Sequence, residues 1–263
     1  MGDGKALQSA TSHYFGQNFA KAFDIDYLAA DNSLKHCWTT SWGLSTRFVG
    51  AIIMTHGDEK GLVLPPRLAP YQVVIVPIYR KNDDKDAVLT AVSHLNQTLS
   101  AAGIRVKVDD RENLTPGFKF NDWELRGVPV RIEIGPRDIA KNSVGLARRD
   151  IPTRAGKQFV SQDGLAETVK RLLDEIQANM LAKATQFRDE NTYEVDNYAA
   201  FKTAVKTGFA KVWWAGSNDD EQRVKEETKA TIRCLPLEQP DGTGTCFYTG
   251  KPAEQMVIFG RSY

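Results

Sequence analysis

The chain has 263 residues, of which 41% are hydrophobic and 25% charged, and its formal net charge is +1. These values are ordinary for a globular protein and exclude a chain that is basic throughout, although a local basic face stays open. No apolar run approaches the length of about 18 residues that a membrane span needs, and no signal peptide is visible, so we expect no membrane partner. Cys37, Cys234 and Cys246 are too widely separated for a disulfide framework, which favours a reducing, cytoplasmic location.

The first of three regions runs from residue 1 to about residue 70. Its run RFVGAIIMTHG (47–57) is apolar enough for a buried helix or a buried strand, and its periodicity does not decide between them. Pro65, Pro66 and Pro70 close the region. Its polar, glycine-containing opening is typical of the middle of a domain, so we expect the chain to be part of something longer.

The second region, from about 71 to 190, alternates predicted strands and helices. The strands are β-branched runs or alternate apolar with polar residues: 71–79, 104–110, 128–135, 143–150 and 156–163. Helices are expected over 83–103, 115–127 and 165–188, where the sequence has an amphipathic pattern or clear end signals. The end signals are Thr115 as N-cap, Pro116 at the first helical position, and Gly103 and Gly127 after the helix ends. This order predicts an α/β (α+β) fold with helices packed on a mixed sheet.

The third region, from about 191 to 263, combines helices with a β-rich end. We expect a helix from Ala199 to Val212, and either a second helix or a charged face over 219–230. Strands are expected within 231–238, 245–250 and 254–263. About 70 residues of this composition bury little core, so a staple or a docking surface is expected.

Two polar motifs in the first region are candidate ligand contacts. Arg47, in GLSTR, has the planar charged group that binds phosphate oxygens in pairs, and the alternative is an arginine in a surface ion pair. Thr11, Ser12 and His13, with Gln8 nearby, have the hydroxyl, imidazole and amide groups that hold polar parts of a small ligand. The alternative for this group is an N-cap or a turn.

Two other motifs carry weaker signals. The segment THGD (55–58) has two metal-donor types without a third, so we expect a helix end and a turn, and His36 beside Cys37 is expected to pack rather than to ligate. Residues 141–157 are strongly basic, which predicts either a face for a phosphate backbone or a solvated hairpin. The basic residues are Lys141, Arg148, Arg149, Arg154 and Lys157.

Long segments of the chain resemble prolyl-tRNA synthetase of the archaeal and eukaryotic-like type. They are DGKALQSATSHYFGQNFAKAFDI (3–25), TTSWGLSTRFVGAIIMTHGDEKGLVLPPRLAPYQVVIVPIY (39–79) and DDRENLTPGFKFNDWELRGVPVRIEIGPRDI (109–139), and the resemblance continues to the terminal Tyr263. GLSTR resembles the third motif of class II synthetases. The resemblance implies a ligase that uses ATP and Mg²⁺ to activate L-proline and transfers it to proline tRNA, and that is a homodimer at full length.

The resemblance also implies a domain organisation. Residues 1–70 would be the end of a class II catalytic domain, and residues 71–188 an anticodon-binding domain with a mixed five-stranded sheet. Residues 189–263 would be the small α+β C-terminal domain of the family.

Site residues follow from the positions that match the family. For catalysis, Arg47 would hold the γ-phosphate and His13 would line the proline pocket. The ATP contacts implied are Gln8, Thr11, Ser45 and Arg47, and the proline contacts are His13, Trp42, Gly43 and Ser45. The anticodon contacts implied are Glu124, Arg131 and Arg137.

The chain departs from the family pattern in two respects. The first two class II motifs are absent from it, so we expect this chain alone not to form prolyl-adenylate. Zinc-bearing members have four cysteines where this chain has Ala215, Asp220, Cys246 and Thr249. One thiolate does not make a closed tetrahedral zinc site, so we expect no bound zinc. Apolar packing would hold the domain instead, through Trp213, Trp214, Phe247, Val257 and Phe259.

Two alternatives stay open beside the ligase interpretation. The chain is then either a freestanding, non-catalytic tRNA-binding module or paralogue, or one of two separate chains that assemble. The retained Arg47 and His13 favour part of a ligase, because a pure binding module has no use for them.

Overall fold

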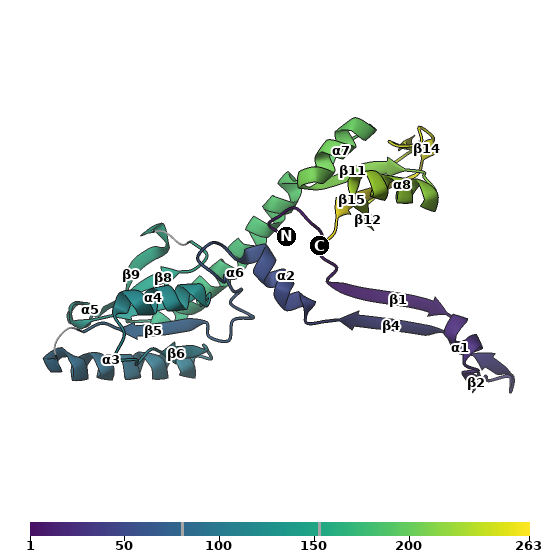
Figure 1. Cartoon of the computed structure of the whole chain (residues 1–263). Coiled ribbons are helices and arrows are strands. Elements are labelled where there is room, and N and C mark those ends of the chain that lie inside the picture. The colour runs from purple at the N-terminus through teal and green to yellow at the C-terminus, as the bar shows by residue number, and fades with distance from the viewer. Residues whose placement is uncertain (80–81, 152–153) are drawn as a thin grey trace. The chain divides into compact units, whose positions relative to one another are not determined.

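The computed structural model describes residues 1–79, 82–151 and 154–263, without the side chains of residues 82, 83 and 154 (Figure 1). The chain divides into two compact units, one of residues 52–191 and one of residues 1–51 together with 192–263. Among the described residues, no helix combines the length and the apolar character that crossing a membrane requires.

The unit of residues 52–191 is built on a five-stranded mixed sheet with the strand order β6-β5-β7-β8-β9. The central β5 (Val73–Pro77) runs parallel to β6 (Val106–Val108) and to β7 (Val130–Ile134). The other two strands, β8 (Ser143–Arg148) and β9 (Lys157–Ser161), continue the sheet in antiparallel fashion. The predicted mixed five-stranded sheet is therefore confirmed.

Helices cover both faces of this sheet. On one face, α3 (Asn82–Ala101) and α6 (Leu165–Glu190) pack against alternate residues of β5, β7 and β8 in the main core. The other face is covered by α4 (Pro116–Leu125) (Figure 1). Its Trp123 packs against Val74 and Val76. All five residues of β5 are buried because both of its faces are covered. Two short elements, α5 (Pro136–Ala140) and the 3₁₀ turn η1 (Arg154–Gly156), complete the unit.

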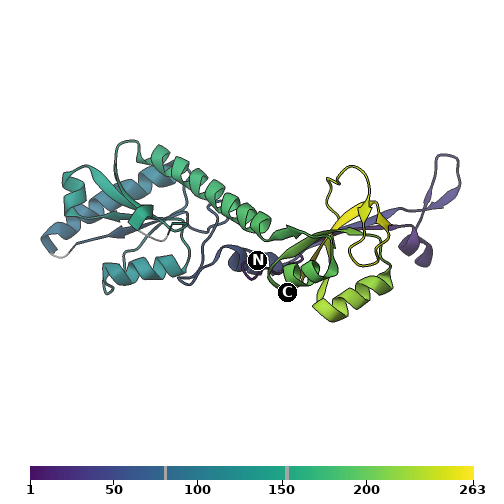
Figure 2. The same cartoon turned by 90° about the horizontal axis from the view of Figure 1, so that it is seen from above.

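The helix ends in this unit follow the predicted signals. Thr115 caps α4, and its hydroxyl oxygen accepts the backbone N–H of Phe118 at 3.3 Å. Gly103 and Gly127 follow α3 and α4 with φ of +82° and +71°, the left-handed region that glycine tolerates. The uninterrupted helix α6 is the long green rod in Figure 2. Its buried stripe ends at Met180, and Phe187 in a later turn is 39% exposed.

The apolar run after GLSTR is a helix, α2 (Arg47–His56), which settles the choice that its sequence left open. The segment THGD forms the expected helix end and turn, because Asp58 and Gly61 exchange two backbone hydrogen bonds of 3.0 Å. None of the ten residues of α2 is fully buried.

The N-terminal part of the other unit contains two small antiparallel sheets. One pairs β1 (Ala10–Gly16) with β4 (Thr39–Leu44), and the other pairs β2 (Asp26–Leu28) with β3 (Leu34–His36). A short helix, α1 (Asn18–Ala22), lies between β1 and β2 in the chain. The sequence did not predict these strands, because apolar side chains stand on both faces of the β1–β4 ribbon and the expected alternation is missing.

The C-terminal part of this unit is a four-stranded sheet with helices. The strand order is β10 (Thr192–Glu194), β11 (Phe209–Trp214), β15 (Gln255–Arg261) and β12 (Ala230–Cys234). The helices are α7 (Tyr198–Thr207) and α8 (Asn218–Thr228), which confirms a helix in the charged run. A two-stranded sheet joins β13 (Gly244–Thr245) to β14 (Pro252–Ala253).

Three predictions for this region were wrong in detail. The helix expected to reach Val212 ends at Thr207, because Gly208 follows and the aromatic and β-branched residues 209–214 form β11. The strand expected over 245–250 keeps only Thr245, since a turn follows. Of the residues expected in the core, Trp213 packs instead on Gly244, outside the core cluster. The others are in it or against it: Trp214, Phe247, Val257 and Phe259.

Candidate functional site

A cavity of about 240 Å³ opens on the face of the five-stranded sheet that α4 covers. Its lining includes two of the three residues predicted to read an anticodon, Glu124 and Arg131. Lys60, Arg149 and Lys157 add positive charge, and Trp123 adds an aromatic wall. The cavity therefore combines a carboxylate, several cations and an apolar surface, which are the groups that bind the edge and the ring of a nucleobase.

Arg131 reaches this cavity because of its place in β7. Val130, Ile132 and Ile134 point into the main core, so the alternating Arg131 and Glu133 point to the α4 face. The Nε and Nη2 atoms of Arg131 donate to Oε1 of Glu133 at 3.1 and 2.9 Å. Its guanidinium carbon lies 4.2 Å from the ring centre of Phe120 on α4. Two independent contacts therefore hold this side chain in place.

Glu124 is presented by the last turn of α4. Its Oε1 atom lies 3.2 Å from Nζ of Lys60, and the side chain is 22% exposed. The carboxylate is thus oriented by a cation while part of it remains open to a ligand.

The basic residues of the hairpin are mostly engaged inside the unit. Arg149 is 5% exposed and forms a forked ion pair with Asp58, 91 residues away, while its Nε donates to the carbonyl of Glu124 at 2.9 Å. Arg148 pairs with Asp150 at 2.9 Å. These residues form neither a bare phosphate-binding face nor a fully solvated hairpin.

Arg154 and Lys141 complete the basic set. The side chain of Arg154 lies outside the described residues. Lys141 is exposed at the end of α5, and Lys157 donates to Glu133 at 2.6 Å.

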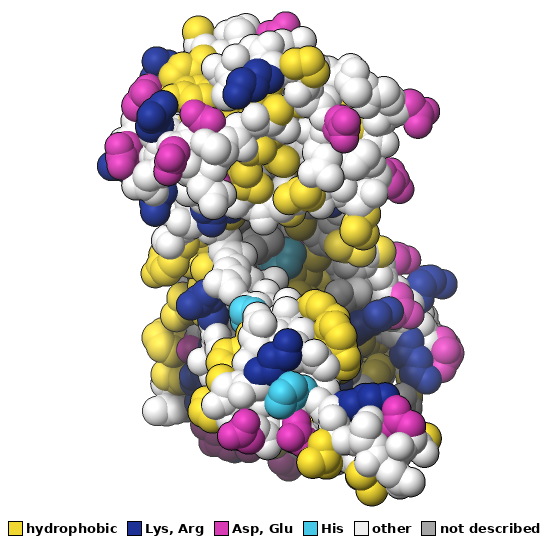
Figure 3. All heavy atoms as spheres, turned by 90° about the vertical axis from the view of Figure 1, so that its right-hand side faces the viewer, with side chains coloured by type: hydrophobic (Ala, Val, Ile, Leu, Met, Phe, Trp, Pro, Cys, Tyr) yellow, Lys and Arg dark blue, Asp and Glu magenta, His cyan; other side chains and the backbone are white. Residues whose placement is uncertain are grey.

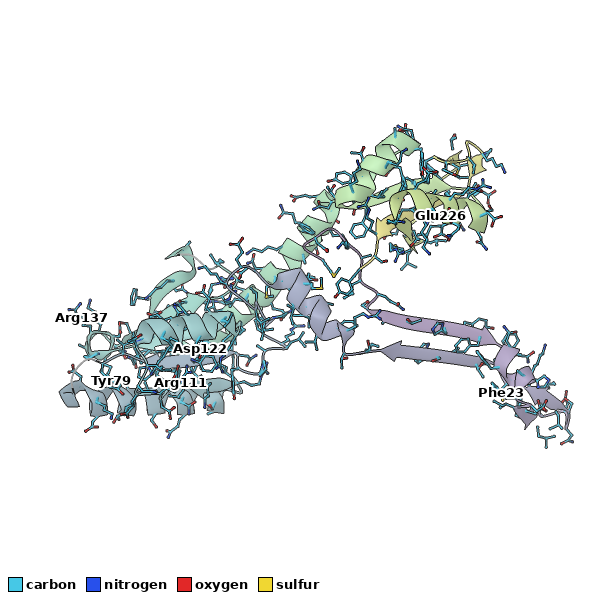
Figure 4. The ribbon with its side chains drawn as sticks, viewed as in Figure 1. Phe23, Tyr79, Arg111, Asp122, Arg137 and Glu226 are labelled. Atoms are coloured by element: carbon cyan, nitrogen blue, oxygen red, sulfur yellow. The ribbon has the colours of Figure 1, made fainter. Side chains whose placement is uncertain are left out.

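Arg137 does not line the cavity. It lies in α5, after the carboxyl end of β7, whereas Arg131 lies near the start of that strand. Figure 4 shows Arg137 at the end of the unit where Tyr79 follows the carboxyl end of β5. The side chain is exposed, and it lies beyond the end of β7 opposite to that of Arg131.

A buried ionic network, which the sequence analysis missed, attaches α4 to the end of β6. Asp109 is 2% exposed and accepts from Arg111 at 2.7 Å and from the indole N–H of Trp123 at 2.8 Å. Arg111 also reaches Asp122 on α4, at 2.8 Å, and Figure 4 shows these two side chains close together. Burial opposes ionisation of Asp109, but the hydrogen bonds from Arg111 and Trp123 outweigh it and lower its pKa to about 2.

The residues predicted to contact ATP come together where the ribbon meets α2. Gln8 donates to the hydroxyl of Thr11 at 2.5 Å, and Arg47 reaches the carbonyl of Gln8 at 3.5 Å. The hydroxyl of Ser45 accepts from the backbone N–H of Arg47 at 3.3 Å, at the first residue of α2. An exposed arginine at a helix N-terminus suits a phosphate group.

Three of the four residues predicted to contact proline lie in the same ribbon, namely His13, Trp42 and Gly43, and Ser45 follows the end of β4. His13 is paired with Ser41 and Thr11 with Gly43, whereas Trp42 is paired with Ser12. Since paired residues share a face and neighbours alternate, the side chain of Trp42 lies on the face opposite to His13. A single face of the ribbon therefore presents Thr11, His13 and Gly43.

The ribbon leaves a large apolar surface uncovered. Figure 3, viewed from the right-hand side of Figure 1, shows exposed hydrophobic side chains in yellow among charged ones. Trp42 is 79% exposed and Leu44 is 73% exposed. A shallow groove here is lined by Ala10, Thr11, Ser12, Trp42, Gly43 and Leu44. Exposed apolar surface of this extent marks an interaction site.

Cys246 lies beside two of the three positions that match lost zinc ligands. Its sulfur accepts the backbone N–H of Thr249 at 3.5 Å. Burial raises the pKa of this thiol, but hydrogen bonds from Thr249 and from the backbone of Ala215 outweigh it and lower the pKa overall. Asp220 instead caps α8, where it exchanges hydrogen bonds with Ser217.

No group of three or more His, Cys, Asp or Glu side chains able to hold a metal ion occurs in the described part of the chain.

Two protein families match separate parts of the chain. The family model described as "Prolyl-tRNA synthetase, C-terminal" matches residues 198–263, and the one described as "Anticodon binding domain" matches residues 72–172. The second match contains the five-stranded sheet and the cavity residues Glu124 and Arg131.

Similar proteins cover the whole chain. The "Proline--tRNA ligase" of Roseiflexus sp. (strain RS-1) is 56% identical over 263 residues, which are 100% of this chain and 55% of that protein. The corresponding protein of Chloroflexus aurantiacus is 54% identical, with the same shares covered. The "Proline--tRNA ligase, chloroplastic/mitochondrial" of Arabidopsis thaliana is 54% identical over 267 residues, or 100% of this chain and 49% of that protein.

The chain thus spans about half the length of the curated relatives it matches. These relatives are named as proline–tRNA ligases. The sequence resemblance, the mixed sheet and both family matches agree, and the chain belongs to the prolyl-tRNA synthetase family.

Proposed function

We propose that this chain is the part of a proline–tRNA ligase that binds the anticodon of proline tRNA and carries the third class II motif. The observation that supports this most strongly is the cavity that brings Glu124 and Arg131 together within the segment matched by the anticodon-binding family. The corresponding domains are residues 1–70, 71–188 and 189–263. A homodimer at full length and a cytoplasmic location belong to the same proposal.

The chemistry of the cavity fits single-stranded bases. Unstacked anticodon bases present their edges to the protein, and an arginine fork donates to the two acceptors O6 and N7 of guanine. Glu124 would accept from base N–H groups. Trp123 offers an apolar wall, and Arg137 would contact the tRNA outside the cavity.

The first region would supply part of the site that activates L-proline with ATP and Mg²⁺. Arg47 at the start of α2 would bind the γ-phosphate, where its charge offsets that of the leaving pyrophosphate. Gln8, Thr11 and Ser45 would contact ATP. His13, with Gly43 and Ser45, would contact proline, whereas Trp42 on the opposite face of the ribbon would not reach the same ligand.

A titration of proline tRNA tests the role of the cavity. We expect Arg131→Glu to weaken binding at least tenfold, because it replaces a donor fork with a charge that repels phosphate and the base acceptors. Arg171→Glu, which makes the same charge change at a 74% exposed position of α6, serves as the control. If Arg131→Glu bound proline tRNA as tightly as the control variant, the assignment of this cavity would be wrong.

A further inference from the structure

Glu133 is a carboxylate that the proposed function does not use, although it is buried beside the cavity. It is 6% exposed, and both of its oxygens are occupied. Oε1 accepts from Nε and Nη2 of Arg131 at 3.1 and 2.9 Å, and Oε2 accepts from Nζ of Lys157 at 2.6 Å. Buried charges persist only when paired in this way, so the group has a specific structural reason to be there.

The sheet register explains how one carboxylate reaches two cations. Arg131 on β7, Ala147 on β8 and Lys157 on β9 form one row across the sheet. Glu133 and Gly145 are paired in the next row of the same face. Because alanine and glycine occupy the middle strand, no bulky side chain separates Glu133 from Lys157.

The contacts of Arg131 determine which of its donors remain for a ligand. A guanidinium group has five N–H donors, and Glu133 takes the one on Nε and one on Nη2. Phe120 covers the plane of the group at 4.2 Å. The remaining donors are the two on Nη1 and the second on Nη2, which together form an end-on fork.

We propose that Glu133 is a positioning residue that fixes Arg131 so that this end-on fork faces the base in the cavity. Two parallel donors match the O6 and N7 acceptors of guanine, whereas adenine presents a donor, N6–H₂, in place of O6. Glu133 thereby sets discrimination between guanine and adenine without touching the base itself. This inference rests on the proposed anticodon function.

The test compares the chain with its Glu133→Gln variant. Dissociation constants are measured for proline tRNA and for proline tRNAs in which one anticodon guanine is replaced by adenine. We expect wild type to prefer guanine at one position, and Glu133→Gln to reduce that preference at least fivefold, because the amide no longer holds Arg131 as a charged acceptor does. Glu167→Gln, which removes the same charge from a side chain that is 79% exposed on α6, is expected to keep the preference.

A double-variant cycle separates positioning from mere support of the fold. Arg131→Lys removes the fork, so adding Glu133→Gln to that variant should change the guanine preference by less than twofold. If Glu133→Gln alone lowered the thermal midpoint but kept the wild-type preference, the inference would be overturned. If wild type showed no guanine preference at any position, the proposed function of the cavity would fail first.

Discussion

Single charged side chains around the cavity are each held by a partner of opposite charge. Arg149 is paired with Asp58, Glu124 with Lys60, and Arg131 with Glu133. Such partners reduce the freedom of long side chains before a ligand arrives, so less entropy is lost on binding. The cavity is therefore arranged in advance of binding.

The buried ionic network around Asp109 predicts that the stability of the fold depends on pH. The pKa of Asp109 is about 2 in the folded chain, below the ordinary value near 3.9, so its ionisation stabilises the fold above about pH 4. That contribution is lost as the pH falls from about 4 to about 2. We expect Asp109→Asn to lower the free energy of unfolding at neutral pH by roughly 2–4 kcal/mol, and the deficit to shrink on acidification.

Urea unfolding at a series of pH values measures this effect. Asp110→Asn is the matched control, since Asp110 is the exposed neighbour of Asp109 in the chain. If the free energy of unfolding of the two variants depended on pH in the same way, the network around Asp109 would contribute nothing to the stability of the fold.

Among the elements, α4 contributes Trp123 and Glu124 to the cavity and covers one face of the sheet. Thr115 fixes where it begins, and Gly127 allows the chain to leave it. The backbone of Gly127 also accepts the N–H of Leu64 at 3.3 Å. The end of α4 is thus bound to a segment about sixty residues earlier in the sequence.

A substitution at Gly127 tests this junction. Gly127 has φ of +71°, and an added Cβ would lie 2.6 Å from the carbonyl group of Leu62. We expect Gly127→Ala to destabilise the unit by about 2 kcal/mol or more in urea unfolding, through both strain and collision.

Gly117→Ala is the control for that substitution. It lies within α4, where a Cβ meets nothing within 4 Å, and it should stabilise the helix by up to about 1 kcal/mol. A stable Gly127→Ala variant would show that this turn can rearrange freely.

The elements also show what the sequence can and cannot predict. Strand β5 and helix α6 were predictable because burial on fixed faces imposes β-branched runs and an amphipathic repeat. The end of α7 was not predicted. The alanine-rich sequence continues a helical pattern beyond Thr207, but pairing with β15 makes Phe209–Trp214 a strand. In the same way, Glu133 sits at an alternating polar position that predicts exposure, and only the cations across the sheet explain its burial.

The candidate site was predictable only in part. Glu124 and Arg131 were identified through resemblance to a family, and the cavity brings them together. The Arg149–Asp58 pair joins residues 91 positions apart, a distance over which no local pattern carries information. The opposite faces of His13 and Trp42 likewise emerge only from the pairing of β1 with β4.

At the scale of the whole molecule, the chain spans about half the length of the relatives it matches. Its ribbon exposes Trp42 and Leu44, and no residue of α2 is fully buried. We expect this chain alone to show no proline-dependent ATP–pyrophosphate exchange, because the first two class II motifs are absent from it. Exchange above the no-proline blank by the purified chain would contradict that expectation.

Recognition of the proline anticodon by this chain is tested most directly by a binding titration of the unmodified chain with two tRNAs at one stated salt concentration. One is proline tRNA, and the other is the same tRNA with its anticodon replaced by that of another amino acid. Anticodon recognition predicts at least tenfold tighter binding of the first, because each mismatched base leaves groups such as Glu124 and Arg131 without their partners. Equal affinity for the two tRNAs would show that the chain does not recognise the anticodon.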